Sequence, residues 1–451
     1  METKRSTFSG KIGFVLAAAG SAVGLGNIWR FPYLAAKYGG GIFLLVYIIL
    51  ALTFGFSLMI AEIAIGRKTG LSPIGAFCKL DKRFAFVGYL AAIVPALILP
   101  YYSVIGGWVT KYFVTFLTGG GHAAAQDGYF NAFIAQPLEP IGWFFLYIAA
   151  TALIVMLGVN KGIEKVSRVM MPVLVILTLF VAIYSACMPG AWEGVLYYIT
   201  PDFSKFSITT VVAAMGQLFY SMSIAMGILI TYGSYMKKDV NLESSVHQTE
   251  LFDTGIAFLA GLMVIPSVFA FSGGTAESLG QGPGLMFVTL PKVFDSMFGG
   301  NVIGTVFFLL VLFAALTSSI SLMETVVSVL SDKLGWRRRI CCLSVFLLSL
   351  VLGIPSSLGN GLWSGFTPLG MDILSFFDFL TNSLMMPVVA LCTCIFVAYV
   401  IKTPAIEEEI EVSAPFRAKK MFRAVIRYVA PVCILLILIS SLLSAFGIMS
   451  I

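Results

Sequence analysis

Charged residues are scarce in this chain. Only 11% of its 451 residues are Asp, Glu, Lys or Arg, whereas 59% are hydrophobic, and the mean hydropathy is +0.97. Soluble globular domains carry about 25% charged residues. Because lipid cannot solvate ionised side chains, the deficit indicates a protein surrounded by a bilayer. The same proportions exclude intrinsic disorder and disfavour a soluble enzyme.

The side chains of metal and hydrolytic chemistry are nearly absent. The chain has two histidines, and none of its seven cysteines forms a CxxC pair. A zinc site or a Ser-His-Asp triad therefore lacks its components, and we expect no enzyme activity. Lys and Arg lie in short clusters between apolar runs rather than on one continuous surface, so we expect no nucleic-acid partner.

Long apolar runs fill most of the chain. A membrane-spanning helix needs about 20 mostly apolar residues. Eleven runs qualify: 12–37, 41–66, 85–117, 141–158, 166–187, 209–236, 251–272, 301–331, 340–356, 371–401 and 422–447. The first follows a polar, basic segment and has no small-residue cleavage site, so we expect a retained span rather than a signal peptide. The predicted fold is an all-α polytopic membrane protein with eleven transmembrane helices.

Basic residues alternate along these spans. All but five of the 28 Lys and Arg residues lie in the N-terminal tail or in the loops after the even-numbered spans. By the positive-inside rule, these segments are cytoplasmic. We therefore expect a multi-pass protein of the cell membrane with its N-terminus in the cytoplasm and its C-terminus outside. The acidic run Glu407, Glu408, Glu409 and Glu411 falls in the last cytoplasmic loop, where we interpret it as a solvated linker.

Two of the spans contain residues that weaken a helix. The first has Gly20, Gly24 and Gly26 near its middle, followed by Asn27; the sixth has Ser221, Ser223 and Gly227. Glycine costs a helix about 1 kcal/mol relative to alanine. One alternative for the glycines is a small-residue packing face between helices. Two interrupted spans five apart instead favour an inverted five-helix repeat with a binding site at the bilayer midplane.

Several motifs resemble those of the neurotransmitter:sodium symporter family. The stretch GSAVGLGNIWRFPY at 20–33, followed by three glycines at 39–41, is similar to the family's first-helix signature. The similarity continues through Glu62, the Gly66-Arg67 pair, the Tyr101-Tyr102 pair, ITYGSY at 230–235 and LTSSI at 316–320. It covers the first ten spans. We expect the leucine transporter-like fold, with helices 1 and 6 unwound.

The resemblance implies the following organisation: a cytoplasmic tail (1–11), a first five-helix repeat (12–187), an extracellular loop (188–208), a second repeat (209–402), a cytoplasmic loop (403–421) and an eleventh helix (422–447). It implies sodium-coupled import of an amino acid by alternating access. Two sodium ions are expected. The first would be bound by Ala22, Asn27, Ser221 and Asp253, and the second by Gly20, Val23, Ala314, Thr317 and Ser318. Hydroxyls such as that of Thr317 more often bond to their own helix, which is the alternative interpretation.

The resemblance also implies where the amino acid binds. The expected residues are Ala22, Gly24, Leu25, Gly26, Ile98, Tyr102, Tyr220, Ser223, Met226, Ser318 and Leu322. Family members that carry amines have an aspartate at the position of Gly24, so glycine favours a substrate with its own carboxylate. Since the pocket would be mainly apolar and uncharged, we expect a neutral, large hydrophobic or aromatic L-amino acid. Ordinary packing remains the alternative for Ile98, Met226 and Leu322.

Asp253 is an ionisable residue early in an otherwise apolar span, and such residues are usually functional. Chloride-dependent members of the family have a neutral residue here, so we expect Asp253 to supply that negative charge and make transport chloride-independent. The alternative is a residue at the cytoplasmic helix end. By resemblance, Arg30 with Asp378 forms the outer gate, and Arg5 with Asp332 forms the inner one. Two other functions stay open: a proton-coupled carrier of the same fold, and a non-transporting amino acid sensor. The oligomeric state is not predicted.

Overall fold

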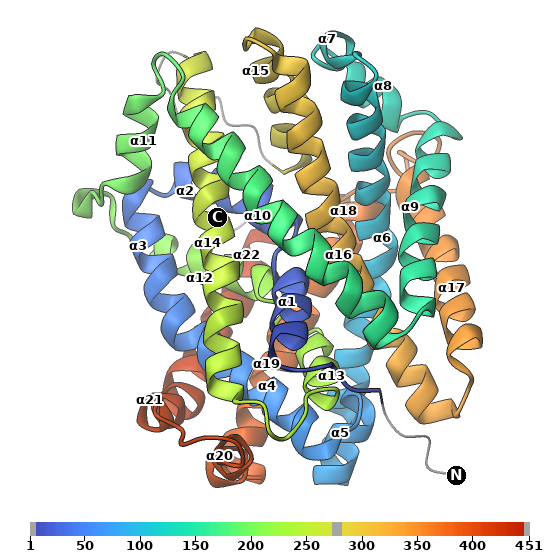
Figure 1. Cartoon of the computed structure of the whole chain (residues 1–451), viewed down its shortest axis with the longest axis vertical. Helices are drawn as coiled ribbons and strands as arrows, with labels where there is room; N and C mark the ends of the chain where they lie inside the picture. Colours follow the sequence, from blue (N-terminus) through green and yellow to red (C-terminus); the bar gives the residue numbers. More distant parts are fainter. Residues whose placement is uncertain (1–5, 273–281, 446–451) are drawn as a thin grey trace.

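The computed structural model describes residues 6–272 and 282–445. These residues form helices that run mostly along the long axis of the molecule (Figure 1), and the described part contains no strand beyond an isolated bridge between Gly40 and Pro201. The predicted all-α membrane fold is confirmed.

The first half of the chain contains five spans. They are α1 (Lys11–Ala22) with π-helix η1 (Gly26–Arg30) and α2 (Phe31–Lys37); α3 (Gly41–Leu50) with η2 (Ala51–Gly55) and α4 (Phe56–Thr69); α6 (Ala85–Leu117); α9 (Glu139–Met156); and η4 (Val159–Glu164) with α10 (Lys165–Ala186). The two arms of the first span meet at an angle of 55°.

The second half repeats this plan. Its spans are α12 (Ile208–Ser221) with α13 (Ile228–Ser234); α14 (Leu242–Ser272); α16 (Gly300–Leu334); α17 (Arg338–Leu358); and α18 (Ile373–Asp378) continuing through η9 (Phe379–Met385), α19 (Met386–Ile395) and η10 (Phe396–Val400). The last span is α21 (Lys419–Ala424), η11 (Val425–Val429) and α22 (Ala430–Ala445).

The count of eleven spans depends on one interrupted helix. In the described part of the chain, nine helices are long and apolar enough to cross a bilayer, and the bent first span is a tenth. The sixth predicted span falls on α12 and α13, which have 14 and 7 residues, and neither is long enough to cross alone. The count of eleven spans therefore remains a prediction, because it requires α12 and α13 together to form one crossing.

Short helices occupy several segments that the hydropathy pattern presents as loops. They are α5 (Pro73–Leu80), η3 (Lys82–Phe84), α7 (Gly121–Ala124), α8 (Tyr129–Ile134), α11 (Trp192–Ile199), η5 (Phe203–Lys205), η7 (Leu285–Thr289), α15 (Leu290–Ser296), η8 (Pro368–Gly370) and α20 (Thr403–Glu411). Helices α5, α20 and α21 lie at one end of the molecule, and α7, α8 and α15 lie at the other (Figure 1).

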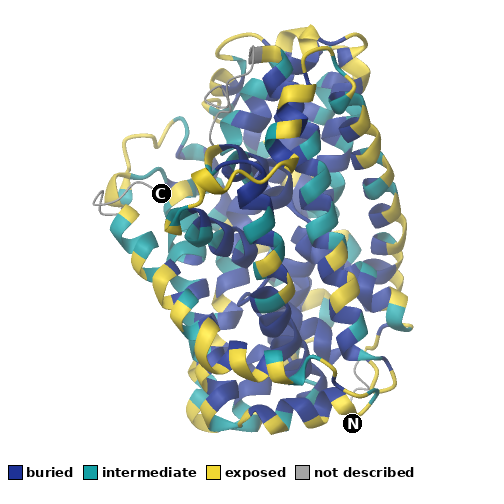
Figure 2. Ribbon diagram, turned by 90° about the vertical axis from the view of Figure 1, so that its left-hand side faces the viewer, coloured by how far each residue is buried: buried dark blue, intermediate teal, exposed yellow. Residues whose placement is uncertain are grey.

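Local sequence explains where the long helices begin and end. Ser207 caps α12, because its hydroxyl accepts a hydrogen bond from the Thr210 amide at 3.1 Å. Helix α16 is flanked by Gly299 and Gly335, both at φ +66°, a conformation that glycine adopts at little cost. Exposed residues follow the outer faces of the long helices (Figure 2). Many exposed residues of these helices are apolar, among them Phe145 and Ile176. Such an exterior is suited to lipid rather than water.

The interpretation of the acidic run as a solvated linker is wrong. Glu407 and Glu409 in α20 are 1% and 4% exposed. Glu409 accepts hydrogen bonds from Arg67 Nε at 2.8 Å and from Lys238 Nζ at 2.6 Å. The Arg67 side chain is fully buried at the end of α4, and a buried guanidinium is unfavourable without a carboxylate. Glu409 therefore supplies the partner of one buried cation from another helix, whereas Glu408 and Glu411 stay exposed.

Candidate functional site

The first span loses its helical hydrogen bonds immediately after Ala22. Val23 is extended at φ −71° and ψ +107°, and helical structure resumes only at Gly26. The side chain of Asn27 bridges the break, since its Oδ1 accepts a hydrogen bond from the Gly24 amide at 3.1 Å. Peptide groups around residues 23–25 are thus released from the helix, within a protein interior where they can serve a ligand.

The sixth span is interrupted more severely, between Ser221 and Ile228. Ser223, Ala225 and Gly227 have φ values of +53°, +64° and +68°. Positive φ is unfavourable for serine and alanine, and such strain concentrates at functional sites. The Ala225 amide donates to the buried Glu62 carboxylate at 2.8 Å. The strained turn is therefore stabilised from the neighbouring helix α4.

The two breaks lie side by side and contact each other. The Ser223 hydroxyl donates to the Ser21 carbonyl at 2.9 Å and lies 3.0 Å from the Ser21 hydroxyl. Across the same contact, Asn27 Nδ2 donates to the Ser221 hydroxyl at 3.0 Å. The glycine pattern therefore marks two helix breaks that meet, and not only a packing face.

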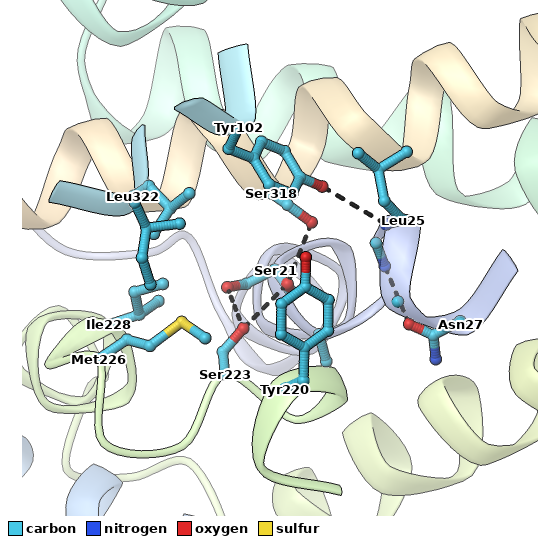
Figure 3. Close-up of a pocket in the computed structure, with 14 residues that line it drawn as sticks. Ser21, Leu25, Asn27, Tyr102, Tyr220, Ser223, Met226, Ile228, Ser318 and Leu322 are labelled. Atoms are coloured by element: carbon cyan, nitrogen blue, oxygen red, sulfur yellow. Dashed lines mark hydrogen bonds between the residues drawn. The ribbon is translucent and has the colours of Figure 1, made fainter. Parts of the chain in front are cut away.

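A cavity lies between the two breaks, α6 and α16 (Figure 3). The residues that line it are Ser21, Ala22, Gly24, Leu25, Gly26, Asn27, Ile98, Tyr102, Tyr220, Ser223, Met226, Ile228, Ser318 and Leu322. All eleven residues predicted to bind the substrate are in this set, although their role in binding remains a prediction. Ser21 and Ile228 were not predicted, and only their proximity to the breaks could have indicated them.

The lining residues separate into two chemical types. Ile98, Met226, Ile228 and Leu322 are apolar, and in Figure 3 the last three lie together on one side. Hydroxyls and free peptide groups lie on the other side, where the Leu25 amide donates to the Tyr102 hydroxyl at 3.4 Å. None of the lining residues carries a charge. The cavity is therefore suited to a neutral molecule with one polar end and one apolar end.

Glycines 24 and 26 give this cavity its shape. A Cβ atom on Gly24 would lie 2.8 Å from Ser318 Oγ and 3.2 Å from the Tyr102 hydroxyl. A Cβ atom on Gly26 would lie only 2.3 Å from the ring of Tyr220. Any larger residue at either position would collide with these side chains, which line the cavity.

Asp253 lies at the centre of a buried polar cluster beside the cavity. It is fully buried, and its carboxylate accepts hydrogen bonds from Asn27 Nδ2 at 2.7 Å and from the Ser221 hydroxyl at 2.8 Å. The Tyr47 hydroxyl lies 3.4 Å from the second carboxylate oxygen. Asp253 is therefore not a solvated helix end. The sequence analysis did not include Tyr47, which lies in a uniformly apolar run without a distinguishing neighbour.

Three of the four residues predicted for the first ion are thus in mutual contact, and the fourth, Ala22, lines the adjacent cavity. A carboxylate, a hydroxyl and an amide are oxygen ligands of the type that hard cations take. In the present arrangement the amide nitrogen of Asn27 faces Asp253. A cation bound here through the amide oxygen would require that side chain to turn over.

The residues predicted for the second ion gather between α1 and α16. The Ser318 hydroxyl lies 3.2 Å from the carbonyl oxygens of Ser21 and Val23 and 3.5 Å from that of Gly20. Gly20 is adjacent to Thr317, because a Cβ atom there would lie 3.2 Å from Thr317 Cβ. The Thr317 hydroxyl donates within its own helix, to the carbonyls of Phe313 at 3.0 Å and Ala314 at 3.1 Å. An ion would compete with these internal bonds for the Thr317 oxygen and the Ala314 carbonyl.

Comparison with known proteins identifies the family. The model of the sodium:neurotransmitter symporter family matches residues 5–123 and 139–448. The chain belongs to this family. It is 32% identical to an uncharacterized sodium-dependent transporter of Haemophilus influenzae, covering 97% of this chain and 98% of that one. It is 33% identical to the uncharacterized sodium-dependent transporter YhdH of Bacillus subtilis, with the same coverage.

A solved structure, that of MhsT in complex with L-phenylalanine, has the same fold. Its TM-score is 0.88 at 37% identity, over 97% of this chain and 100% of that one. This sodium:neurotransmitter symporter is therefore a sodium-dependent transporter and a multi-pass membrane protein rather than an enzyme.

The outer gate predicted for this symporter is not bridged directly. Among the described residues Arg30 and Asp378 form no salt bridge; Arg30 lies over the ring of Tyr220, with its Cζ atom 5.3 Å from the ring centroid. Asp378 instead accepts hydrogen bonds from Asn382 at 2.6 Å and Tyr101 at 3.2 Å. A salt bridge between the two predicted residues would require one of them to leave these partners.

The N-terminal segment of the symporter packs against α13 and the residue that follows it. Phe8 is 1% exposed, and its ring packs edge-to-face on Tyr232 and Tyr235 with centroids 5.6 and 6.1 Å apart. Asp332, predicted for the inner gate, accepts a hydrogen bond from the Ser72 amide at 2.8 Å. Its expected partner Arg5 lies outside the described residues. The inner gate pair therefore remains a prediction.

Proposed function

We propose that this symporter uses the inward sodium gradient to import a neutral, large hydrophobic or aromatic L-amino acid without a requirement for chloride. The observation that carries the proposal is the contact between Asp253, Asn27 and Ser221 next to a cavity formed by two broken helices. The cluster offers oxygen ligands for a cation, and the cavity offers an apolar volume with a polar end.

The polar end is suited to the amino acid's carboxylate. The Leu25 amide and the Tyr102 hydroxyl lie there together, at the start of the helical segment that begins at Gly26. A carboxylate is favoured at such a helix start. It would also face the ion cluster beyond Asn27, so ion and substrate would each strengthen the binding of the other. Reciprocal binding of this kind provides the coupling that a symporter needs.

The apolar end supports a large hydrophobic side chain. Met226 is unbranched and adapts to varied ligand shapes, and Ile98, Ile228 and Leu322 complete an uncharged wall. A charged side chain would find no partner on this wall and would lose its hydration. The complex of MhsT with L-phenylalanine, a relative at 37% identity, supports the same class of substrate.

Chloride independence is inferred from the surroundings of Asp253. Its carboxylate already takes the hydrogen bonds of Asn27 and Ser221, with the Tyr47 hydroxyl close by. These are the donors that a separate anion would need. A second negative charge in the same buried cluster would be repelled by the carboxylate.

The test is uptake into proteoliposomes made with the purified full-length protein. Labelled tryptophan and leucine are supplied with an inward sodium gradient, with potassium in place of sodium, and with gluconate in place of chloride. We expect uptake that needs sodium and is unchanged in gluconate. Accumulation driven by a pH gradient without sodium would indicate the proton-coupled carrier instead, and binding without uptake would indicate a sensor.

Replacing Asp253 with Asn separates the ion argument from the substrate argument. The substitution keeps the shape but removes the charge, so we expect sodium affinity to fall at least tenfold, the size of a lost charge-assisted interaction of about 1.5–3 kcal/mol. Chloride should restore part of the activity by supplying the missing charge. Unchanged sodium dependence in this variant would refute the proposed role of Asp253.

A further inference from the structure

A second cavity lies at the end of the molecule that holds α5, α20 and α21, away from the substrate cavity. It is formed by the end of α16, by α5 and by the residues just before and after α5. The lining residues are Leu71, Ser72, Ile74, Gly75, Cys78, Lys79, Lys82, Val329, Asp332 and Lys333. Neither the ion clusters nor the substrate cavity accounts for this arrangement.

Three lysines give the cavity an excess of positive charge. Lys79, Lys82 and Lys333 form no salt bridge among the described residues, and Asp332 is the one carboxylate in the lining. Arg67, at the same end of the molecule, is by contrast paired with Glu409. The chain therefore leaves unbalanced positive charge at this place, which favours an anion supplied from outside.

The wall of the cavity also offers an unsatisfied hydrogen-bond donor. Ser72 is fully buried, and its hydroxyl has no hydrogen-bond partner in the described part of the chain. Its backbone amide is already bonded to Asp332. Buried hydroxyls normally have a partner, and a phosphate oxygen in the cavity would provide one once the Ser72 side chain turned toward it.

Apolar surface leads from the cavity to the lipid-facing side of α6. Ile74 and Val329 form a small buried cluster with Ala92, separate from the main core. Next to it, Phe86, Tyr89 and Ile93 are 50%, 43% and 44% exposed and follow one face of α6. Lys333 Nζ lies 5.6 Å from the centroid of the Tyr89 ring, so the cavity's charge adjoins this apolar face. Tyrosine and lysine together are typical of the membrane interface.

We propose that this cavity binds the headgroup of an anionic glycerophospholipid. The phosphate would lie among the three lysines and accept the Ser72 hydrogen bond, and an acyl chain would follow Phe86, Tyr89 and Ile93. A free phosphate would contact the lysines but not the apolar face of α6. A phospholipid would contact both and is therefore the ligand that we propose. Since Asp332 lines the same cavity, the bound headgroup would also adjoin the predicted inner gate.

The test is lipid binding to the full-length protein in detergent, followed by native mass spectrometry. The probes are phosphatidylglycerol and phosphatidylcholine with the same acyl chains, and inorganic phosphate as competitor. No sodium or amino acid is present, so the result does not depend on the proposed transport function. We expect phosphatidylglycerol to bind at least tenfold more tightly than phosphatidylcholine, and millimolar phosphate to compete poorly.

Substitutions locate the site. The triple variant K79Q/K82Q/K333Q should lose roughly 100-fold in phosphatidylglycerol affinity, since each lysine near an anionic lipid contributes about fivefold. The control K165Q/R339Q/K420Q removes the same charge from exposed positions at the same end of the molecule, and it should change affinity less than threefold. Ser72→Ala should lose about tenfold through the missing hydrogen bond.

Three outcomes would overturn the proposal. Equal losses in the lysine variant and in the control would mean that only general charge attracts the lipid. Equal affinity for the two phospholipids would exclude a site for an anionic headgroup. Full displacement by inorganic phosphate would show a site for free phosphate instead of a lipid.

Discussion

Gly26 is the residue at which the shape of the substrate cavity can be tested most directly. Replacing it with alanine adds one methyl group, whose carbon would lie 2.3 Å from Cδ1 and 2.5 Å from Cε1 of the Tyr220 ring. An ordinary contact begins at 3.4 Å, so the ring must move by more than 1 Å. Tyr220 lines the cavity, and Arg30 lies over its ring, so the displaced ring disturbs both the pocket and the predicted outer gate.

The expected size of the effect follows from the cost of overpacking. Extra methyl groups in packed sites cost about 1–3 kcal/mol. Where this free energy raises the substrate-bound state relative to the unbound state, the half-saturating amino acid concentration should rise roughly 5- to 150-fold. The assay is sodium-driven uptake into proteoliposomes over a range of tryptophan or leucine concentrations, with protein amount and thermal stability measured in parallel.

Gly216→Ala is the matched control. Gly216 lies one turn before Tyr220 on α12, and nothing lies within 4 Å of a Cβ atom placed there. Alanine is also the better helix former, so this variant should transport normally with equal or greater stability. The reasoning would be refuted if Gly26→Ala transported with unchanged affinity. Equal impairment of both variants would also refute it, since the clash at Tyr220 would then not be the cause.

Three further predictions concern other parts of the molecule. Ser318→Ala removes the hydroxyl that contacts the carbonyls of the first break, so sodium affinity should fall about tenfold. The control is Ser349→Ala, because the Ser349 hydroxyl bonds within its own helix; this variant should leave sodium activation curves unchanged. Arg67→Met removes one of the two cations that pair with the buried carboxylate of Glu409, since Lys238 remains. The loss of the charged hydrogen bond should destabilise the protein by about 1.5–3 kcal/mol, seen as a lower thermal midpoint; a midpoint within 1 °C of wild type would contradict this. Burial opposes ionisation of Glu407, but the hydrogen bonds from Arg423 and Lys419 outweigh burial and lower the pKa of Glu407. The ionised Glu407 therefore stabilises the fold above the ordinary glutamate pKa, and this stabilisation is lost as the pH falls through the acid range. Thermal unfolding between pH 7 and pH 4 should therefore show a smaller loss in Glu407→Gln than in wild type, and parallel curves would refute the assignment.

The local features of the site could be read from the sequence. A glycine-rich stretch inside an apolar run predicts where a membrane helix gives up its hydrogen bonds, and both interruptions lie where residues 20–27 and 221–227 indicate. Asp253 could be singled out because a carboxylate is costly among apolar residues. These inferences depend on near neighbours in the chain, which the sequence displays directly.

Other features depend on residues far apart in the chain. Tyr47 reaches the Asp253 cluster across 206 positions, and Glu409 reaches Arg67 across 342. An acidic run has the same local sequence whether its carboxylates are hydrated or paired with a buried guanidinium. The sequence could not distinguish the two cases, and the interpretation as a linker was wrong. The orientation of the Asn27 amide and the separation of Arg30 from Asp378 likewise depend on which side chains compete for each polar group.

The sequence by itself thus determined the membrane class, the family and the two places where helices break, because hydrophobic length and glycine content act locally on the backbone. Only the tertiary structure decided which polar groups meet inside the bundle, because a buried hydrogen bond or ion pair requires two distant segments to pack within about 3 Å.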